Sequence, residues 1–237
     1  MPSRERAFLE TIQDLEEKFR IQFSGNLTAS TQSLIDRVRR SLSWLRRATE
    51  VSDEDLPPRF VDLWIALNAL YGQARYAKDF ESRDKEDFGE FVQRLAELRS
   101  GQSQLGQLIN RKHVQIQARE LIQNKHLWNE WWGKKLDKYR ERSGKRLVQF
   151  EKSLKNDDAA AFLSHLFERL QVLRNQIVHG SSSASTRKSR DALYPAILLL
   201  EEIVPEFIQL MIREGQGIDW PPVPYPGKGS PQYPEQS

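Results

Sequence analysis

Cysteine is absent from this 237-residue chain, and histidine is rare, with only four residues. Without cysteine the protein has neither disulfides nor thiolate metal sites. The histidines are scattered along the sequence and form no HExxH-like pair, so a zinc site is not expected. We therefore expect no metal and no cofactor, and any chemistry has to be carried by ordinary side chains.

Long apolar runs are also lacking. The most apolar segments, WIALNAL at 64–70 and YPAILLLEEIVPEFIQLMI at 194–212, are too short for the roughly 20 residues that a membrane helix needs, or are interrupted by acids and prolines. Residues 1–20 are charged and contain no apolar core of the kind found in signal peptides. These features predict a cytoplasmic protein without a membrane among its partners.

Strand-like alternation and internal repeats are missing too, whereas apolar residues often recur at helical spacing, so the predicted fold class is all-α. The expected helices span 4–23, 30–48, 58–77, 84–99, 103–123, 162–180 and 191–213. Pro195 and Pro205 are expected to start, kink or segment the last helix. We expect one helical domain over 1–214 and a Pro-rich tail over 215–237 that is disordered or runs along the surface.

The helix predicted over 58–77 is apolar on most sides, which is typical of a buried helix. Asn68 lies within it. Because a buried amide left unpaired costs about 1–3 kcal/mol, we expect Asn68 to bond to a neighbouring helix or to help position the arginine of the motif at 174–179.

The helix predicted over 162–180 carries a core stripe and a polar end. Apolar residues recur at helical spacing at Phe162, Leu163, Leu166, Phe167, Leu170, Leu173 and Ile177. Asp157 and Asp158 precede the helix as N-cap candidates, and Gly180 follows it as a C-terminal stop. The stripe accounts for the apolar residues but leaves the final turns unexplained.

Those final turns hold Arg174, Asn175 and His179. Arginine offers a fork of donors that suits phosphate, and histidine exchanges protons near neutral pH. Together they suffice for RNA cleavage without a metal, in which a base removes the 2′-hydroxyl proton and a cation stabilises the attacked phosphate. The competing interpretation is structural, because a histidine before glycine also stabilises a helix C-terminus, and Arg174 can be a solvated charge.

The spacing of this pair favours a site shared by two chains. Residues five apart on a helix are separated by roughly 140° around the axis and about 7.5 Å along it, so Arg174 and His179 do not share a face. They converge if the last turn is frayed, or if two chains pair their motif helices. The second arrangement predicts a homodimer whose composite cleft contains two histidines.

Positive charge is concentrated in one segment. The whole chain carries a net charge of only +3, whereas residues 125–155 hold ten Lys and Arg against four acids. The candidate RNA-binding residues are Lys134, Lys135 and Lys138 in this segment, with Arg187, Lys188 and Arg190 after the motif. Trp128, Trp131 and Trp132 interleave with the charges, as in a nucleic-acid groove, although their helical spacing equally fits packing onto the protein body.

Two segments resemble a known family. LRNQIVHG at 173–180, near the end of a long helix, resembles the signature of HEPN-domain proteins, which is an arginine, a polar residue, a spacer and a histidine. RFVDLWIALNALYG at 59–72 is similar to a buried helix of the Apea-like and related HEPN groups. The resemblance covers 55–75 and 160–212, while 100–157 looks like an elaboration specific to a subgroup.

The resemblance implies a HEPN-type helical bundle with an inserted basic helical segment, which dimerises to form a shared cleft. Many members are metal-independent endoribonucleases of toxin–antitoxin and antiviral systems. By position, Arg174 and His179 match the catalytic pair and Asn175 matches the supporting polar residue, whereas Asn68 matches no motif position. The expected partners are RNA, a second copy of the chain through the motif helix, and an antitoxin or regulatory protein.

Two alternatives to an enzyme stay open. The chain fits a non-catalytic HEPN-like binding or scaffold module, such as an accessory subunit or an antitoxin partner. It also fits a nucleotide-binding accessory protein in which the same Arg174 and His179 hold a ligand phosphate without cutting.

Overall fold

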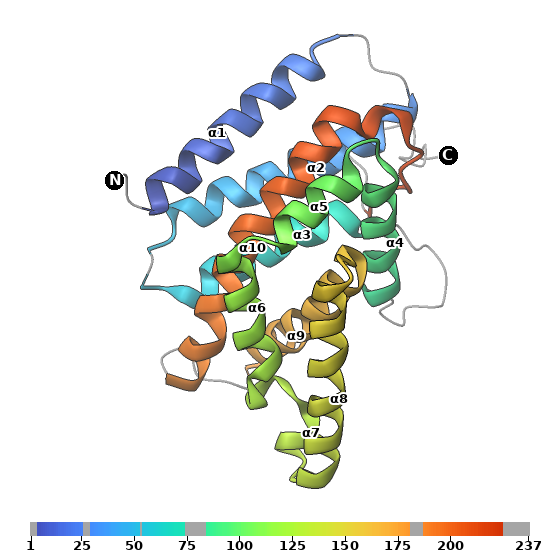
Figure 1. Cartoon of the computed structure of the whole chain (residues 1–237). Coiled ribbons are helices and arrows are strands. Elements are labelled where there is room, and N and C mark those ends of the chain that lie inside the picture. Colours follow the sequence, from blue (N-terminus) through green and yellow to red (C-terminus); the bar gives the residue numbers. More distant parts are fainter. Residues whose placement is uncertain (1–3, 26–28, 53, 74–83, 181–186, 225–237) are drawn as a thin grey trace, which may run out of the picture.

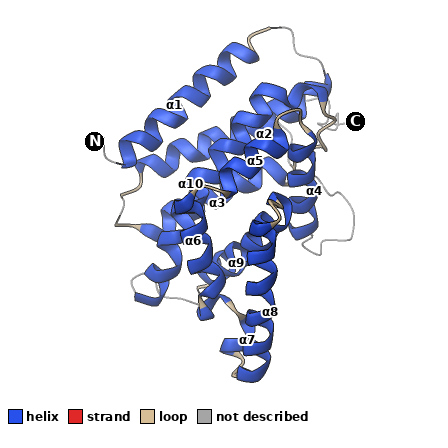
Figure 2. Cartoon of the chain, in the orientation of Figure 1, coloured by secondary structure: helices blue, strands red, loops and turns tan. Residues whose placement is uncertain are grey.

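In the computed structural model, which describes residues 4–25, 29–52, 54–73, 84–180 and 187–224, all regular structure is helical (Figures 1 and 2). The α-helices are α1 (Arg4–Gln22), α2 (Ala29–Glu50), α3 (Leu56–Tyr71), α4 (Asp84–Glu97), α5 (Gly101–Ile109), α6 (Lys112–Gln123), α7 (Asn129–Trp132), α8 (Leu136–Lys155), α9 (Ala159–Val178) and α10 (Arg187–Glu214). Short 3-10 helices, η1 (Lys125–Leu127) and η2 (Gly215–Gly217), follow α6 and α10. The predicted all-α class is confirmed.

The helices form two groups, one around α10 and one around α9, and α6 contacts both central helices. In one group α2 packs along α3, and α10 packs against α3, α6 and α1. In the other, α9 packs against α4 and α8 and also contacts α5 and α6. Figure 1 shows α1 and α2 at one end of the molecule and α7 with the adjoining part of α8 at the opposite end. The basic segment therefore builds a helical projection beyond the bundle.

An aromatic cluster fixes α9 within the core. The ring of Phe167 stacks on Phe88 of α4 at 4.2 Å between centroids and lies 5.4 Å from both Trp64 and Tyr71 of α3. Phe207 of α10 lies 6.5 Å from Phe88. Large rings bury much apolar area and prefer such offset and edge-to-face contacts. This cluster holds the first half of α9 against three neighbouring helices.

Several expected boundaries differ from the observed ones. The helix predicted over 103–123 is two helices, α5 and α6, which are separated at Asn110 and Arg111. Helix α10 runs unbroken from Arg187 to Glu214 with Pro195 and Pro205 inside it, so neither proline starts or segments the helix. Contacts with several other helices support α10 through these positions, which offsets the roughly 3 kcal/mol that an internal proline costs.

The expectation for Asn68 is wrong. Helix α3 buries Phe60, Leu63, Leu67 and Leu70, but the side chain of Asn68 is exposed. It is therefore not a buried amide that has to pair with a neighbouring helix, and among the described residues no hydrogen bond joins it to Arg174. The charged side chains that α3 does bury, Arg59 and Asp62, are bonded to Glu201 and Arg47, respectively.

The first part of the tail lies against the bundle. Trp220 and Val223 are buried, and the Trp220 indole donates a hydrogen bond to the Gly215 carbonyl at 2.8 Å. The almost fully buried Arg37 donates to the Leu70 and Pro221 carbonyls at 2.6 and 2.8 Å, which joins α2, α3 and the tail. Residues 225–237, the rest of the predicted tail, lie outside the described part of the chain.

Candidate functional site: the C-terminal end of α9 and its basic surroundings

Local sequence signals set both ends of α9. Of the two candidate N-caps, Asp158 is the cap, and its carboxylate accepts a hydrogen bond from the Ala161 backbone N–H at 2.9 Å. At the other end His179 is the C-cap residue, and Gly180 follows with a φ of +64°. That left-handed conformation is strained for residues with a Cβ and accounts for glycine at this position.

The predicted catalytic residues lie at this end of α9. Arg174 is half-buried as a residue, and its guanidinium donates through Nη1 to the Asn175 Oδ1 at 2.9 Å. Asn175 and His179 are exposed, and the His179 backbone N–H donates to the Asn175 carbonyl at 3.0 Å. Asn175 therefore contacts the other two residues, through its side chain and its backbone, respectively.

Arg174 faces α3 and α4. Burial raises the pKa of the Tyr71 hydroxyl well above its ordinary value; Asp84 and Asp87 raise it further, whereas the positive charge of Arg174 opposes the increase. One turn earlier on α9, Gln171 donates to the Asp84 carboxylate at 3.4 Å. Both observations place Arg174 on the side of α9 that looks toward the end of α3 and the start of α4.

His179 belongs to a different face of the helix. Arg169, Val172, Gln176 and His179 fall within about 80° of one another at helical spacing, whereas Arg174 is roughly 140° from His179. Gln176 donates to the His126 carbonyl at 2.7 Å, so this face looks toward η1 and α7. Within the described residues no hydrogen bond joins the side chains of Arg174 and His179.

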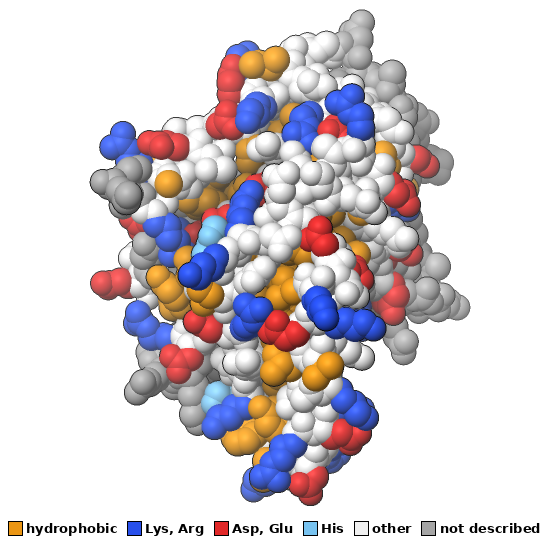
Figure 3. Space-filling view, viewed as in Figure 1, with side chains coloured by type: hydrophobic (Ala, Val, Ile, Leu, Met, Phe, Trp, Pro, Cys, Tyr) orange, Lys and Arg blue, Asp and Glu red, His pale blue; other side chains and the backbone are white. Residues whose placement is uncertain are grey.

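The predicted RNA-binding residues are divided among several elements. Lys134, Lys135 and Lys138 are exposed at and just after the turn between α7 and α8. Figure 3 shows Lys and Arg side chains gathered at this end of the molecule, with acidic side chains among them. Arg190 is exposed near the start of α10. The side chains of Arg187 and Lys188 lie outside the described part.

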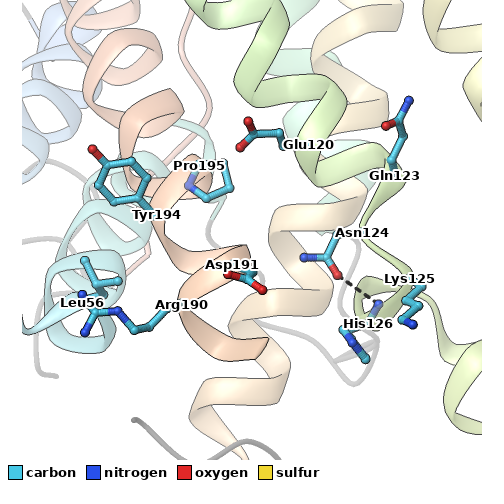
Figure 4. A pocket seen from close by; sticks show the side chains of 10 residues that line it. All are labelled: Leu56, Glu120, Gln123, Asn124, Lys125, His126, Arg190, Asp191, Tyr194 and Pro195. Carbon is cyan, nitrogen blue, oxygen red and sulfur yellow. Dashed lines mark hydrogen bonds between the residues drawn. The ribbon is translucent and has the colours of Figure 1, made fainter. Parts of the chain in front are cut away.

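Arg190 lines a cleft of about 730 Å³ between α10 and the α6–η1 region. In Figure 4 the Asp191 and Arg190 side chains come from α10, and Asn124 and His126 lie across the cleft from them. The Asn124 side chain accepts a hydrogen bond from the His126 backbone N–H at 3.0 Å. The lining also includes Glu120 and Lys125, so acidic and basic groups balance and the cleft has no excess charge of either sign.

The sequence left open whether Trp128, Trp131 and Trp132 line a nucleic-acid groove or pack onto the protein body. Trp128 is buried, and its indole donates to the Ile122 carbonyl at 3.2 Å, so it packs the projection onto the bundle. Trp132 is 55% exposed, although its indole N–H donates to the His126 carbonyl at 2.8 Å. Trp131 is half-buried, and the Lys125 Nζ lies 4.5 Å from the centroid of its ring. Of the three, Trp132 therefore presents the most of its ring to solvent.

A groove that the sequence did not single out lies between α7, α8 and α9. It has a volume of about 500 Å³, and its lining includes Arg142, Lys145 and Arg146 of α8 and Arg169 of α9. The spacing of the three α8 cations was a usable sequence signal, since residues three and four apart share a helix face. Arg169 carried no such signal, because it lies within the apolar stripe of α9.

No protein-family model, no curated protein and no solved structure matches the chain. None of the helices in the described ranges is long and apolar enough to cross a membrane. In the same ranges no three His, Asp or Glu side chains form a group that could hold a metal ion.

Proposed function

We propose that this protein is a HEPN-type endoribonuclease that cleaves RNA without a metal ion, in bacterial toxin–antitoxin or antiviral defence. The observation that carries the proposal is the arrangement at the end of α9. Arg174 is bonded to Asn175, and His179 stands one helical turn further on with its side chain open to solvent. Arginine supplies a phosphate-binding fork, histidine a group for proton transfer, and Asn175 an anchor for the arginine.

The reaction is an internal transesterification of the RNA strand. A His179 imidazole takes the proton of the 2′-hydroxyl, O2′ attacks the adjacent phosphorus, and the bond from phosphorus to O5′ breaks. A second imidazole, protonated, delivers its proton to O5′. The products are a 2′,3′-cyclic phosphate and a free 5′-hydroxyl. Arg174 binds the non-bridging oxygens, whose negative charge grows in the transition state.

Two copies of α9 supply the groups that one copy does not bring together. Arg174 and His179 point to different faces of the helix, and proton removal and proton delivery each need a positioned group. Val178, which lies between these faces at the end of α9, is 53% exposed. An antiparallel pair of motif ends would cover Val178 and set the Arg174 of one protomer beside the His179 of its partner.

Cleavage of single-stranded RNA by purified protein in EDTA tests this function. The wild type is expected to cut RNA and leave cyclic phosphate ends, whereas a strand with a single 2′-deoxyribose at the cut site stays intact. His179→Ala is expected to lower the rate by at least about 10²-fold, because positioned proton transfer contributes 10²–10⁴-fold. His113→Ala, at an exposed histidine of α6, is the matched control and should cut normally.

Full activity of His179→Ala, with an unchanged unfolding midpoint, would exclude this mechanism. A wild type that leaves RNA intact and is monomeric at micromolar concentration would instead point to the non-catalytic binding module. Expression in bacteria gives a second readout, because a toxic nuclease should lose its toxicity in Arg174→Ala.

A further inference from the structure

The groove between α7, α8 and α9 carries an excess of positive charge. Arg142, Lys145, Arg146 and Arg169 line it, and Glu130 is the acidic side chain among its lining residues. Arg142 is paired with Glu130, and Lys145 with Glu141 at 2.6 Å. The positive charges of Arg146 and Arg169, which lie nearer α9, have to be compensated by other groups.

A single carboxylate is shared by the remaining cations. Glu168 of α9 lies 2.6 Å from the Arg146 Nη2 and 3.7 Å from the Arg169 Nη2, and it is also paired with Lys85 of α4. One negative charge therefore faces three positive ones. A bound anion would reduce their mutual repulsion, because such charges interact strongly where solvent is partly excluded.

Arg169 is the best-defined cation of the groove. It is only 8% exposed, its Nη1 donates to the Leu127 carbonyl at 2.6 Å, and its guanidinium lies over the Trp128 ring, 4.1 Å from the centroid. Its Nε is buried and has no hydrogen-bond partner among the described residues. Burying a charged group with incomplete hydrogen bonding is costly, and a negative charge bound close to it reduces that cost.

The groove and the proposed catalytic histidine lie on one face of α9. Arg169 and Val172 line the groove, Gln176 follows one turn later, and His179 follows another turn on, about 15 Å from Arg169 along the axis. The exposed Trp132 is bonded to the same His126 carbonyl as Gln176. An exposed aromatic ring therefore lies beside the helix, between the level of the groove and that of His179.

We infer that this groove binds the phosphate backbone of single-stranded RNA and leads the strand along α9 to His179, with an unpaired base stacked on Trp132. The inference rests on the proposed nuclease function and names the cations that hold its substrate. Guanidinium groups bind phosphate in a fork geometry, and unpaired bases stack on exposed aromatic rings without regard to sequence. A duplex, whose bases are already stacked, would make only the phosphate contacts.

Binding of a fluorescent single-stranded RNA to the His179→Ala protein tests the inference without cleavage. Arg142→Gln with Lys145→Gln should weaken binding at least tenfold. The salt dependence of the logarithm of the binding constant should become shallower by about 1.4, because each phosphate that a cation neutralises on a single strand contributes about 0.7 to the slope. Lys18→Gln with Arg20→Gln on α1 is the matched control, since it also removes one lysine and one arginine, each of which is paired with an acid.

Arg146→Gln provides a second variant in which Glu168 keeps Lys85 as a partner. It should weaken RNA binding and leave the unfolding midpoint close to that of the parent. Trp132→Ala should weaken binding of the single strand more than binding of a duplex of the same length. Binding by both groove variants at the level of the α1 control, with an unchanged salt slope, would overturn the inference.

Cleavage by proteins with an intact His179 separates this inference from the function itself. Relative to the wild type, groove variants should lose more activity on a long single strand than on a dinucleotide, because a dinucleotide does not reach the groove. If the groove variants cut both substrates as fast as the wild type does, the groove is rejected as the RNA-binding site and the nuclease function is kept. Groove-dependent RNA binding by a wild type that cuts neither substrate would reject the nuclease and keep the groove as an RNA site.

Discussion

At the scale of single residues, Asn175 connects the arginine and the histidine of the motif. Its side chain accepts from Arg174, and its carbonyl accepts from the His179 backbone. Only the first contact depends on the side chain. In the proposed nuclease Asn175 would therefore position Arg174, and this contribution can be separated from that of helix formation.

Replacement of Asn175 with alanine should lower the cleavage rate by at least about tenfold, because a hydrogen bond to a charged group contributes about 1.5–3 kcal/mol. Asn175→Asp keeps an acceptor for Arg174 and should restore the rate to near the wild-type value. Single-turnover cleavage of one RNA substrate by both variants measures this difference. A residue needed only for the helix would give two equally active proteins, or two equally inactive ones.

Residue identities in the motif were accessible from the sequence, but the surroundings of other residues were not. Arg174, Asn175 and His179 stood out because the apolar stripe of α9 did not explain them. Arg169 lies within that stripe, and its burial depends on Trp128 and the Leu127 carbonyl, which come from a segment about forty positions away. The prediction for Asn68 was wrong because a mostly apolar helix can still leave one side in water, and Asn68 lies on that side.

At the scale of helices, glycines at two positions in the α8–α9 region have opposite roles. Gly180 follows α9 with a φ of +64°, whereas Gly144 lies inside α8, and neither has other atoms within 4 Å of a Cβ built on it. An alanine side chain would therefore meet no steric clash at either position. The difference between them lies in the backbone conformation that each one requires.

Gly180→Ala should lower the free energy of unfolding by about 1 kcal/mol, because a Cβ is strained in the left-handed region. Gly144→Ala should raise it by about 0.5–1 kcal/mol, because glycine is unfavourable inside a helix. Urea unfolding of both variants gives the two values. Changes of the same sign would show that the end of α9 does not require a left-handed residue.

Helix positions were largely predictable because the apolar stripes are regular, whereas the errors arise from contacts between distant parts of the chain. The region predicted as one helix over 103–123 divides at Asn110 and Arg111, where Arg111 turns to pair with Glu202 and Glu206 of α10. That ion pair joins residues about ninety positions apart, so no local pattern indicates it. The unbroken course of α10 through its prolines likewise depends on the helices packed around it.

At the scale of the whole molecule, the contact between α8 and α9 makes stability depend on pH. Burial lowers the pKa of His165, and the positive charge of Arg146, whose Nη1 lies 3.0 Å from the His165 Nδ1, lowers it further. Lys85 acts in the same direction, whereas Glu168 and Asp158 oppose the change. His165 is therefore harder to protonate in the folded protein than in the unfolded chain.

The lowered pKa of His165 makes the folded protein less stable in acid. Below about pH 6.5, the ordinary value for histidine, the unfolded chain takes up a proton that folded His165 still resists, so the free energy of unfolding falls as the solution becomes more acidic. His165→Gln removes the titrating group and should make this decrease smaller. Urea unfolding between about pH 7.5 and pH 5.5 measures both slopes. Equal slopes would assign the pH dependence to other groups.

The arrangement of the two helix groups was not available from helical periodicity. Apolar stripes show that each helix has a buried face, but they do not say which faces meet. The contacts of Phe167 with α3 and α4, and the donation from Arg37 of α2 to the Pro221 carbonyl, join parts of the chain that are distant in sequence. The expected single domain over 1–214 stays a prediction.

One backbone carbonyl links ligand binding at Trp132 to the stability of the last turns of α9. The His126 oxygen accepts from both the Trp132 indole and the Gln176 amide, so the α7 segment and the last turns of α9 share an anchor. A ligand that immobilises Trp132 would make opening of those turns rarer, since binding to the closed form alone lowers the open population. The amide protons of His179 and Gly180 would then exchange with deuterium more slowly, which makes them a label-free gauge of occupancy.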